Sequence, residues 1–151
     1  MDQAVFEVYG KPQGKGRPRA SMIGGHARMY TPAATASYEN KIMLCYQQQH
    51  AGIRFAPPIT LEVNAYFAIP KSYPKKKAAL CCQNIIRPTC KPDMDNVVKV
   101  VADALNGIAY HDDSGIVEMR IAKRYGNPER LVVRISGELE STEVTMQEGA
   151  D

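Results

Sequence analysis

The sequence has no tryptophan, only three phenylalanines, and no apolar run long enough to cross a membrane. A membrane-spanning helix needs about 20 consecutive apolar residues, so we expect no membrane partner. The first ten residues have neither a basic start nor a long apolar segment, which argues against an export signal. The four cysteines form no CxxC pair, so a zinc site is not expected. We therefore expect a cytoplasmic protein with reduced thiols.

Acidic residues are scarce in the first part of the chain and concentrated at its end. Between residues 11 and 91, thirteen Lys and Arg stand against two Glu, whereas residues 137–151 hold five acidic residues and no basic one. The length and the 44% of hydrophobic residues suit a single core. We predict one domain over residues 1–137, followed by an acidic, flexible tail over residues 138–151. The basic body indicates a nucleic-acid partner.

Alternation of apolar and polar residues predicts several strands, and Pro and Gly mark their ends. Pro57-Pro58 is expected to break the chain before a long strand, in which Leu61, Val63, Ala65 and Phe67 would face the core. Thr31-Pro32 is typical of a helix start, with Thr as the cap and Pro at the first helical position. The predicted strands cover residues 4–9, 20–23, 26–30, 59–69, 116–125 and 131–136; the predicted helices cover residues 31–50, a short segment after residue 75, and 95–106.

The last two strands are predicted to be antiparallel and joined by the turn Gly126-Asn127-Pro128, and the two short strands around Gly24-Gly25 to form a hairpin. The elements follow no βαβ order. The sequence therefore predicts an α+β fold, with a small mixed or antiparallel sheet of four to five strands packed with two to three helices.

Five carboxylates and one lysine lie between residues 92 and 113. Asp93 and Asp95 stand where the chain enters a predicted helix. Side chains two residues apart in an extended segment lie on the same side, so both carboxylates would reach one cation. Carboxylate oxygens suit Mg²⁺ and Mn²⁺. A helix cap would explain one of these aspartates equally well, but it would leave the other unexplained.

Lys99 and Asp103 follow Asp95 at successive i+4 spacings. One interpretation is a salt-bridge ladder, in which each pair contributes about 0.2–0.5 kcal/mol. The other makes Lys99 the cation that meets a phosphate beside the metal, with Asp103 orienting it. Asp112-Asp113 follows the helix in a turn, where acidic residues are common. Together with the basic body, this pattern favours a metal-dependent nuclease.

The segment KPDMDNVVKVVADALNG (91–107), followed by HDDSGI (111–116), resembles the RusA-type Holliday-junction resolvases, a family common in bacteria and their prophages. GKGRPR (14–19) and YTP (30–32) resemble the phage-like branch of that family. The resemblance implies a homodimer that cuts four-way DNA junctions with paired symmetric nicks, in recombination and repair. It also implies Mg²⁺, with Mn²⁺ as an alternative, and no organic cofactor.

The resemblance also assigns roles to individual residues of the acidic segment. The metal ligands would be three aspartates, the catalytic lysine would follow them on the helix, and neighbouring motif positions would support them. Asp103 is added to the supporting set from its spacing to the lysine. The assigned metal and catalytic residues are Asp93, Asp95, Lys99 and Asp113, and the supporting residues are Asn96, Asp103 and Asp112.

Phosphate contacts are expected from basic residues in two loops and a hairpin. Glycines in the 14–19 loop would let its backbone approach DNA closely, while the 75–77 lysines could equally be a solvated helix start. The predicted DNA-binding residues are Lys11, Lys15, Arg17, Arg19, Arg28, Lys75, Lys76 and Lys77. Two other functions stay open: a flap or nicking endonuclease, and a non-catalytic DNA-binding module whose aspartates are caps and salt-bridge partners.

Overall fold

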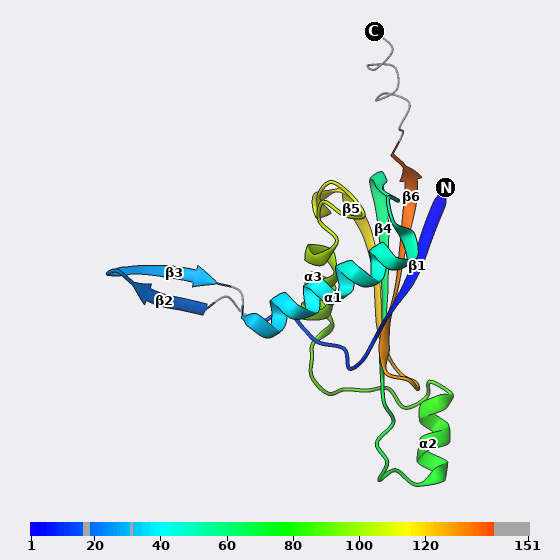
Figure 1. Cartoon of the computed structure of the whole chain (residues 1–151). Helices are drawn as coiled ribbons and strands as arrows, with labels where there is room; N and C mark the ends of the chain where they lie inside the picture. Colours follow the sequence, from blue (N-terminus) through cyan, green and yellow to red (C-terminus); the bar gives the residue numbers. More distant parts are fainter. Residues whose placement is uncertain (17–18, 31, 141–151) are drawn as a thin grey trace.

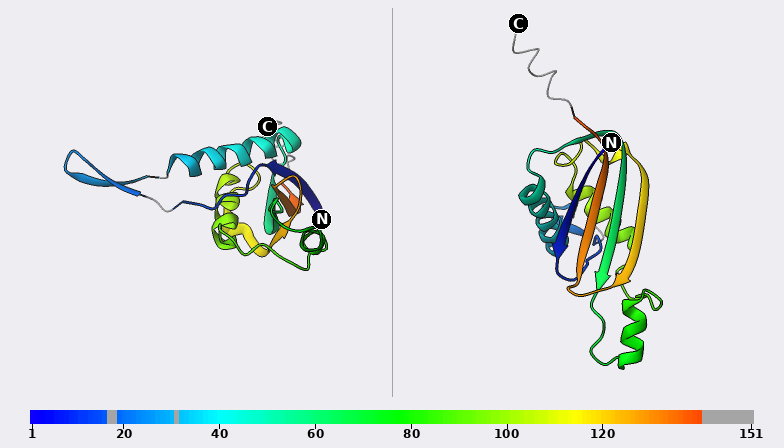
Figure 2. Two further views of the ribbon diagram at one scale, coloured as in Figure 1. Left: turned by 90° about the horizontal axis from the view of Figure 1, so that it is seen from below. Right: turned by 90° about the vertical axis from the view of Figure 1, so that its right-hand side faces the viewer.

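A four-stranded sheet forms the centre of the protein in a computed structural model that describes residues 1–16, 19–30 and 32–140. β6 is antiparallel to both β1 and β4, whereas β4 and β5 are parallel. The predicted α+β class with a small mixed sheet is confirmed. The sheet has the order β1-β6-β4-β5 (Figures 1 and 2), with bounds β1 (Asp2–Tyr9), β4 (Phe55–Phe67), β5 (Ile116–Tyr125) and β6 (Arg130–Leu139).

The central strand β4 alternates between the two faces of the sheet, as predicted. The four residues expected in the core are buried, and Ile59 is buried with them. The residues between them are half-exposed on the other face. This period of two is the expected pattern for a strand with one covered face. The buried residues of β4 are Phe55, Ile59, Leu61, Val63, Ala65 and Phe67.

Two helices, α1 (Ala33–His50) and α3 (Met94–Ala104), cover the buried face and contact each other (Figure 1). In α3 the predicted apolar stripe is confirmed, because Val97, Val101 and the following Leu105 are fully buried. The short helix α2 (Lys75–Cys82) lies beyond the end of β4 (Figure 1). No helix among the described residues is long and apolar enough to cross a membrane.

A two-stranded hairpin projects away from the sheet and helices (Figure 2). It consists of β2 (Arg19–Ile23) and β3 (His26–Tyr30), so the predicted hairpin is confirmed. Its turn needs Gly24 and Gly25, whose φ angles are +60° and +79°, a region that glycine adopts without steric cost.

Three predictions about strand pairing, strand order and strand ends are wrong. β5 and β6 run in opposite directions but do not pair with each other, because β4 lies between them. The parallel pair β4–β5 also needs a long crossover, and α2 and α3 lie in it, so the chain does contain a βαβ connection. Pro57-Pro58 does not end a segment: both residues lie within β4, and the pairing with β6 shifts register between Ala56 and Thr60. The shift accommodates two residues that lack a backbone N–H.

Several predicted boundaries also move by a few residues. Helix α1 begins at Ala33 with Pro32 in the capping position, and the predicted cap Thr31 lies outside the described residues. β6 continues to Leu139, so the predicted domain boundary at residue 138 falls inside a strand. The rest of the predicted acidic tail, residues 141–151, lies outside the described residues.

Candidate active site

The chain turns into α3 at the pair of aspartates that the sequence singled out. Asp93 occupies the capping position with extended dihedral angles, and its side chain makes no capping hydrogen bond. Asp95 lies in the first helical turn rather than at the cap. The expectation that both stand in an extended segment is therefore wrong, although both side chains are exposed at the same end of the helix. A helix N-terminus favours such negative charges.

The carboxylate of Asp93 is exposed to solvent. Its side chain is 54% exposed, and its ion pair is with Lys91, at 3.3 Å, whose side chain is 88% exposed. An ion pair between two exposed groups is weak and easily exchanged. The oxygens of Asp93 are therefore accessible to a ligand that arrives from solvent.

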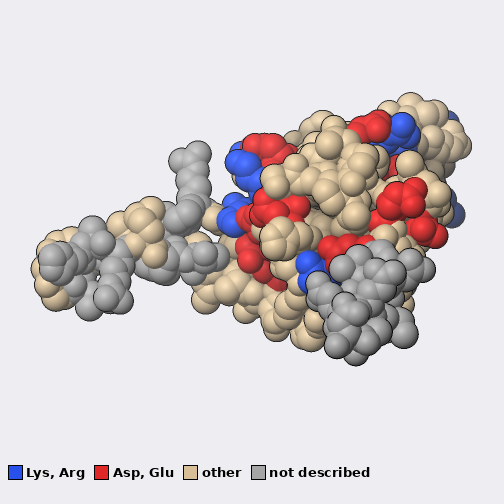
Figure 3. Space-filling model, turned by 90° about the horizontal axis from the view of Figure 1, so that it is seen from above, with Lys and Arg blue, Asp and Glu red and all other residues tan. Residues whose placement is uncertain are grey.

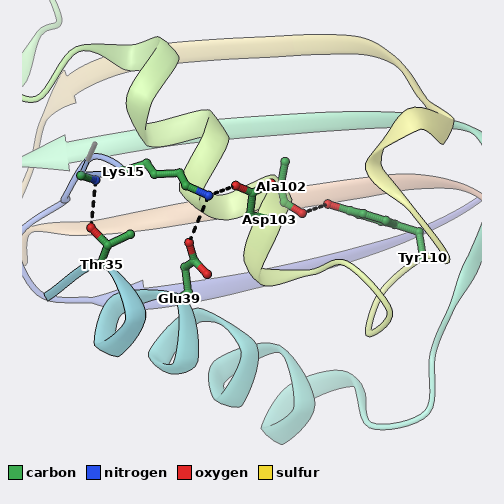
Figure 4. Close-up of polar contacts among 7 residues, drawn as sticks. Lys15, Thr35, Glu39, Ala102, Asp103 and Tyr110 are labelled. Carbon is green, nitrogen blue, oxygen red and sulfur yellow. Dashed lines mark hydrogen bonds and ion pairs between the residues drawn. The ribbon is translucent and has the colours of Figure 1, made fainter. Parts of the chain in front are cut away.

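Asp103 binds Lys15 instead of Lys99. The ammonium of Lys15 contacts the Asp103 carboxylate and lies 3.6 Å from Glu39 of α1 (Figure 4). The hydrogen bond to Asp103 raises the pKa of Lys15. Lys99 is exposed and has no ion pair within the part of the chain that the structure describes. The i+4 spacing predicted an ion pair between Lys99 and Asp103. The carboxylate of Asp103 instead pairs with Lys15, which lies in a loop far away in the sequence.

The loop that carries Lys15 is packed between the starts of α1 and α3. The backbone N–H of Lys15 donates to Asn96 O at 3.0 Å. The backbone N–H of Gly16 donates to Thr35 Oγ1 at 2.9 Å (Figure 4). A Cβ on Gly14 would lie 2.9 Å from Asn96 Cβ, and a Cβ on Gly16 would lie 2.7 Å from Thr35 Oγ1. These glycines allow a close approach to Asn96 and Thr35 of the protein itself, and the predicted approach of this loop to DNA stays a prediction.

The predicted doublet Asp112-Asp113 lies at the other end of α3. The carbonyl oxygen of the Asn106 side chain accepts a hydrogen bond from the backbone N–H of Asp113 at 2.9 Å, and this fixes the turn to the helix end. Asp112 accepts one from the backbone N–H of Ser114 at 3.1 Å. The sequence did not reveal this role of Asn106, because an Asn followed by Gly107 is also typical of a helix end.

The two adjacent aspartates have opposite electrostatic surroundings. Hydrogen bonds from Ser114 lower the pKa of Asp112. Partial burial raises the pKa of Asp113, and the carboxylates of Asp112 and Asp103 raise it further. Below them Tyr110 is buried, and its hydroxyl donates to Ala102 O at 2.7 Å (Figure 4). The carboxylates that influence Asp113 are thus those at its own end of α3.

The predicted metal ligands do not form one cluster in the single chain. Asp93 and Asp95 stand at the first turn of α3, while Asp113 is held beside Asn106 past its last turn. Within residues 1–16, 19–30 and 32–140, no three His, Cys, Asp or Glu side chains are arranged so that they could hold a metal ion. Asp93 and Asp95 thus stand two residues apart at the start of α3, and Asp113 follows the other end of that helix.

A shallow pocket of about 250 Å³ lies beside the turn that holds the aspartate doublet. Its lining combines apolar residues of β4 with polar residues of the turn. His111, which precedes the aspartate doublet, belongs to this lining. The lining residues are Pro57, Ile59, Tyr110, His111, Asp112, Ser114 and Gly115.

The predicted DNA-binding residues are spread over separate parts of the molecule. Lys11 is exposed in the loop after β1, and Lys75, Lys76 and Lys77 are exposed at the start of α2. The ammonium of Lys77 lies 3.9 Å from the ring centre of Tyr73, which is a cation–π contact within the protein. Arg17 and the side chains of Arg19 and Arg28 lie outside the described part of the chain.

The surface is not uniformly basic. Viewed from above, the body shows several groups of acidic side chains, with Lys and Arg beside some of them (Figure 3). The positive charge that the composition predicts is therefore not concentrated on this face. Of the predicted DNA-binding residues that the structure describes, Lys75, Lys76 and Lys77 lie on α2, and Lys11 and Lys15 lie on the loop after β1.

Comparison with known proteins identifies relatives over most of the chain. A family model described as "Endodeoxyribonuclease RusA" matches residues 9–136. The chain is also 38% identical over 137 residues to "Uncharacterized protein YqaN" of Bacillus subtilis (strain 168). That alignment covers 89% of this chain and 96% of the relative. Both matches include α3 and the turn after it.

Proposed function

Because the chain belongs to the RusA family of endodeoxyribonucleases, we propose that it resolves four-way DNA junctions by paired symmetric nicks, in recombination and repair. The observation that carries this proposal is the family match over residues 9–136, which spans the exposed aspartates and lysine at the start of α3. The reaction is hydrolysis of one phosphodiester bond in each of two strands.

We propose that Asp93, Asp95 and Asp113 would hold Mg²⁺, or Mn²⁺ in its place. The donor chemistry fits, because carboxylate oxygens are the ligands these ions prefer, and Asp93 uses no oxygen to cap α3. The position of Asp113 as the third ligand rests on the family resemblance, since it lies at the other end of the helix. A bound ion would polarise the scissile phosphate and favour ionisation of the attacking water.

Lys99 is proposed to neutralise charge on the phosphate. It lies one turn after Asp95, and residues at i and i+4 share a helix face. Its side chain is exposed, so the ammonium reaches solvent without breaking an interior contact. A positive charge fixed beside the reacting phosphate stabilises the transition state more than the ground state.

We propose that two copies act together on one junction. A dimer with two-fold symmetry presents two identical sites, and a four-way junction offers two strands for symmetric cleavage. Affinity for DNA would come from the exposed basic residues, such as Lys11 and the lysines of α2. Their contacts with phosphate are independent of sequence and weaken as salt is added.

The proposal predicts that Asp95→Asn abolishes cleavage of a four-way junction in Mg²⁺ while junction binding is retained. The physical reason is that an amide is a poorer ligand than a carboxylate for a hard cation. Cleavage is measured on labelled junctions with Mg²⁺ or with EDTA, and binding by gel shift in Ca²⁺. Asp2→Asn, on the exposed start of β1, is the matched control and should cleave as the wild type does.

The substrates in this assay separate the remaining alternatives. Wild-type protein should cut the four-way junction in preference to a Y-fork and a linear duplex. Equal cleavage of all three would replace the resolvase assignment with a less selective endonuclease. A folded wild-type protein that binds junctions but cuts none of them with Mg²⁺ would instead be a DNA-binding module.

A further inference from the structure

The two edges of the sheet differ in how their backbone groups are covered. On β1, three outward carbonyls accept hydrogen bonds from side chains of α1. Lys41 Nζ donates to Tyr9 O, Gln49 Nε2 donates to Glu7 O at 3.5 Å, and a ring nitrogen of His50 lies 2.8 Å from Val5 O. These contacts occupy the edge that β1 would otherwise present to another strand. Proteins commonly cover sheet edges in this way to prevent pairing.

On β5 the free edge is covered only near its end. Arg87 donates from Nε and Nη2 to Lys123 O at 2.9 and 2.8 Å. Backbone groups of successive strand residues point to opposite edges, so Met119 and Ile121 direct their N–H and C=O groups to the same side as Lys123. Within the described residues, no side chain covers these groups as α1 covers β1. β5 is therefore an edge available for pairing.

The side chains of β5 on the helix side of the sheet are apolar and incompletely covered. Met119 stands beside Leu61 and Ile121 beside Val63, so they extend the buried row of β4. They remain 47% and 42% exposed, and Val117 is 69% exposed. An apolar row on an open strand edge invites association with another strand.

The sequence of β5 is complementary to itself in one antiparallel register. If two copies pair about an axis at Met119, Val117 of each copy lies opposite Ile121 of the other. On the opposite face, Glu118 of each copy lies opposite Arg120 of the other. Shifting the axis to Glu118 or to Arg120 would place identical charges opposite each other, which is unfavourable for a cross-strand pair. The charges therefore favour the register centred on Met119 over these two registers, and an axis at Ile121 would place Met119 opposite Lys123, whose carbonyl Arg87 already occupies.

We propose that a second copy of this chain pairs its β5 with β5 of the first, antiparallel, around a two-fold axis at Met119. The backbone groups of Met119 would pair with Met119 of the other copy and those of Ile121 with Val117. The apolar row and two Glu118–Arg120 cross-strand pairs complete the interface. The interface is isologous, as expected for a two-fold dimer, and it joins two four-stranded sheets into one. The proposal rests on the homodimer part of the proposed function and is independent of DNA cleavage.

Charge-reversal variants test this register. Glu118→Arg leaves two arginines facing each other across the axis, and Arg120→Glu leaves two glutamates. Each variant alone should be a monomer at a concentration where the wild type is a dimer, as measured by light scattering after gel filtration without DNA. An equimolar mixture should recover dimers that contain one copy of each, because both cross-strand pairs are then of opposite charge. Native mass spectrometry identifies the mixed dimer by its mass.

Matched controls separate this interface from other surfaces. Arg134→Glu changes the same residue type on the same face of the sheet, where Arg134 pairs with Glu62 at 3.4 Å, and it should stay dimeric. Val5→Glu on the covered edge of β1 should also stay dimeric. Met22→Glu tests the hairpin, where Met22 is 72% exposed, and a dimer is again expected. Circular dichroism melting confirms that each variant is folded.

Several results would overturn the proposal. A wild-type protein that is monomeric at about 100 µM, or single charge variants that stay dimeric, would exclude β5 as the interface. Folded monomers that do not combine when mixed would exclude the register. Dissociation by Met22→Glu would assign the interface to the hairpin. None of these measurements involves cleavage, so the interface can be tested even if the protein does not cleave DNA.

Discussion

Neighbouring aspartates in this chain differ because the tertiary structure surrounds them differently. Hydrogen bonds from Ser114 lower the pKa of Asp112. Partial burial and two nearby carboxylates raise the pKa of Asp113. The sequence identified the doublet as one feature. It could not predict the surroundings of Asp113, because its partial burial and the approach of Asp103 arise only when the turn packs against α3.

The ion pair between Lys15 and Asp103 predicts a pH-dependent effect on stability. The hydrogen bond to Asp103 raises the pKa of Lys15 above its usual 10.5. The pair therefore stabilises the fold fully below pH 10.5, and this contribution is lost as the pH rises through the higher pKa of the folded state. Asp103→Asn should lower the free energy of unfolding by about 1 kcal/mol at pH 7, as measured by urea denaturation.

A double-mutant cycle provides the control for this prediction. In a Lys15→Met background, Asp103→Asn should cost less than in the wild type, because the partner charge is already absent. An equal cost in both backgrounds would show that Asp103 acts through another contact. The difference between Asp103→Asn and wild type should also narrow above pH 10.5 if Lys15 is the titrating partner.

At the scale of secondary-structure elements, the loop of residues 14–16 determines how α1 and α3 sit together. Its backbone is bonded to Asn96 at the start of α3 and to Thr35 at the start of α1, and Lys15 bridges the two helices. The segment that the sequence predicted to be a DNA-binding loop is thus also a connection within the protein. Composition could not reveal this, because glycine and lysine are typical of both kinds of loop.

Gly16→Ala should destabilise the protein by about 1–3 kcal/mol, the usual cost of forcing an extra methyl group into a packed site. The added Cβ would lie 2.7 Å from Thr35 Oγ1. Removing that oxygen should relieve the clash, so Gly16→Ala should cost less in a Thr35→Ala background. Urea denaturation of the four proteins measures this. Identical costs in both backgrounds would mean that Pro32, 3.2 Å from the added Cβ, is the obstacle.

At the scale of the whole molecule, the four-stranded sheet and its two helices are complete by the end of β6. The last strand runs to Leu139, and Glu140 is held to Arg54 by an ion pair at 3.3 Å. No core residue of the described chain lies beyond this point. The stability of the domain should therefore come from residues 1–140.

Truncation after Glu140 tests this expectation. The melting temperature should stay within about 2 °C of the full chain, because every buried apolar residue that the structure describes is retained. The removed segment carries three carboxylates and no base, so affinity for DNA should rise by about twofold at low salt and by less at high salt. A large drop in melting temperature would show that residues 141–151 contribute to the fold.

The sequence by itself determined the local elements and the chemically important segment. The alternation in β4, the apolar stripe of α3 and the Gly24-Gly25 hairpin follow from short-range periodicity and from backbone preferences, which adjacent residues encode directly. Only the tertiary structure decided that β4 separates β5 from β6, that Lys15 binds Asp103, and that Asp113 stands apart from Asp93. These outcomes depend on contacts between residues far apart in the chain. The local sequence around each residue does not determine which distant residue it will contact.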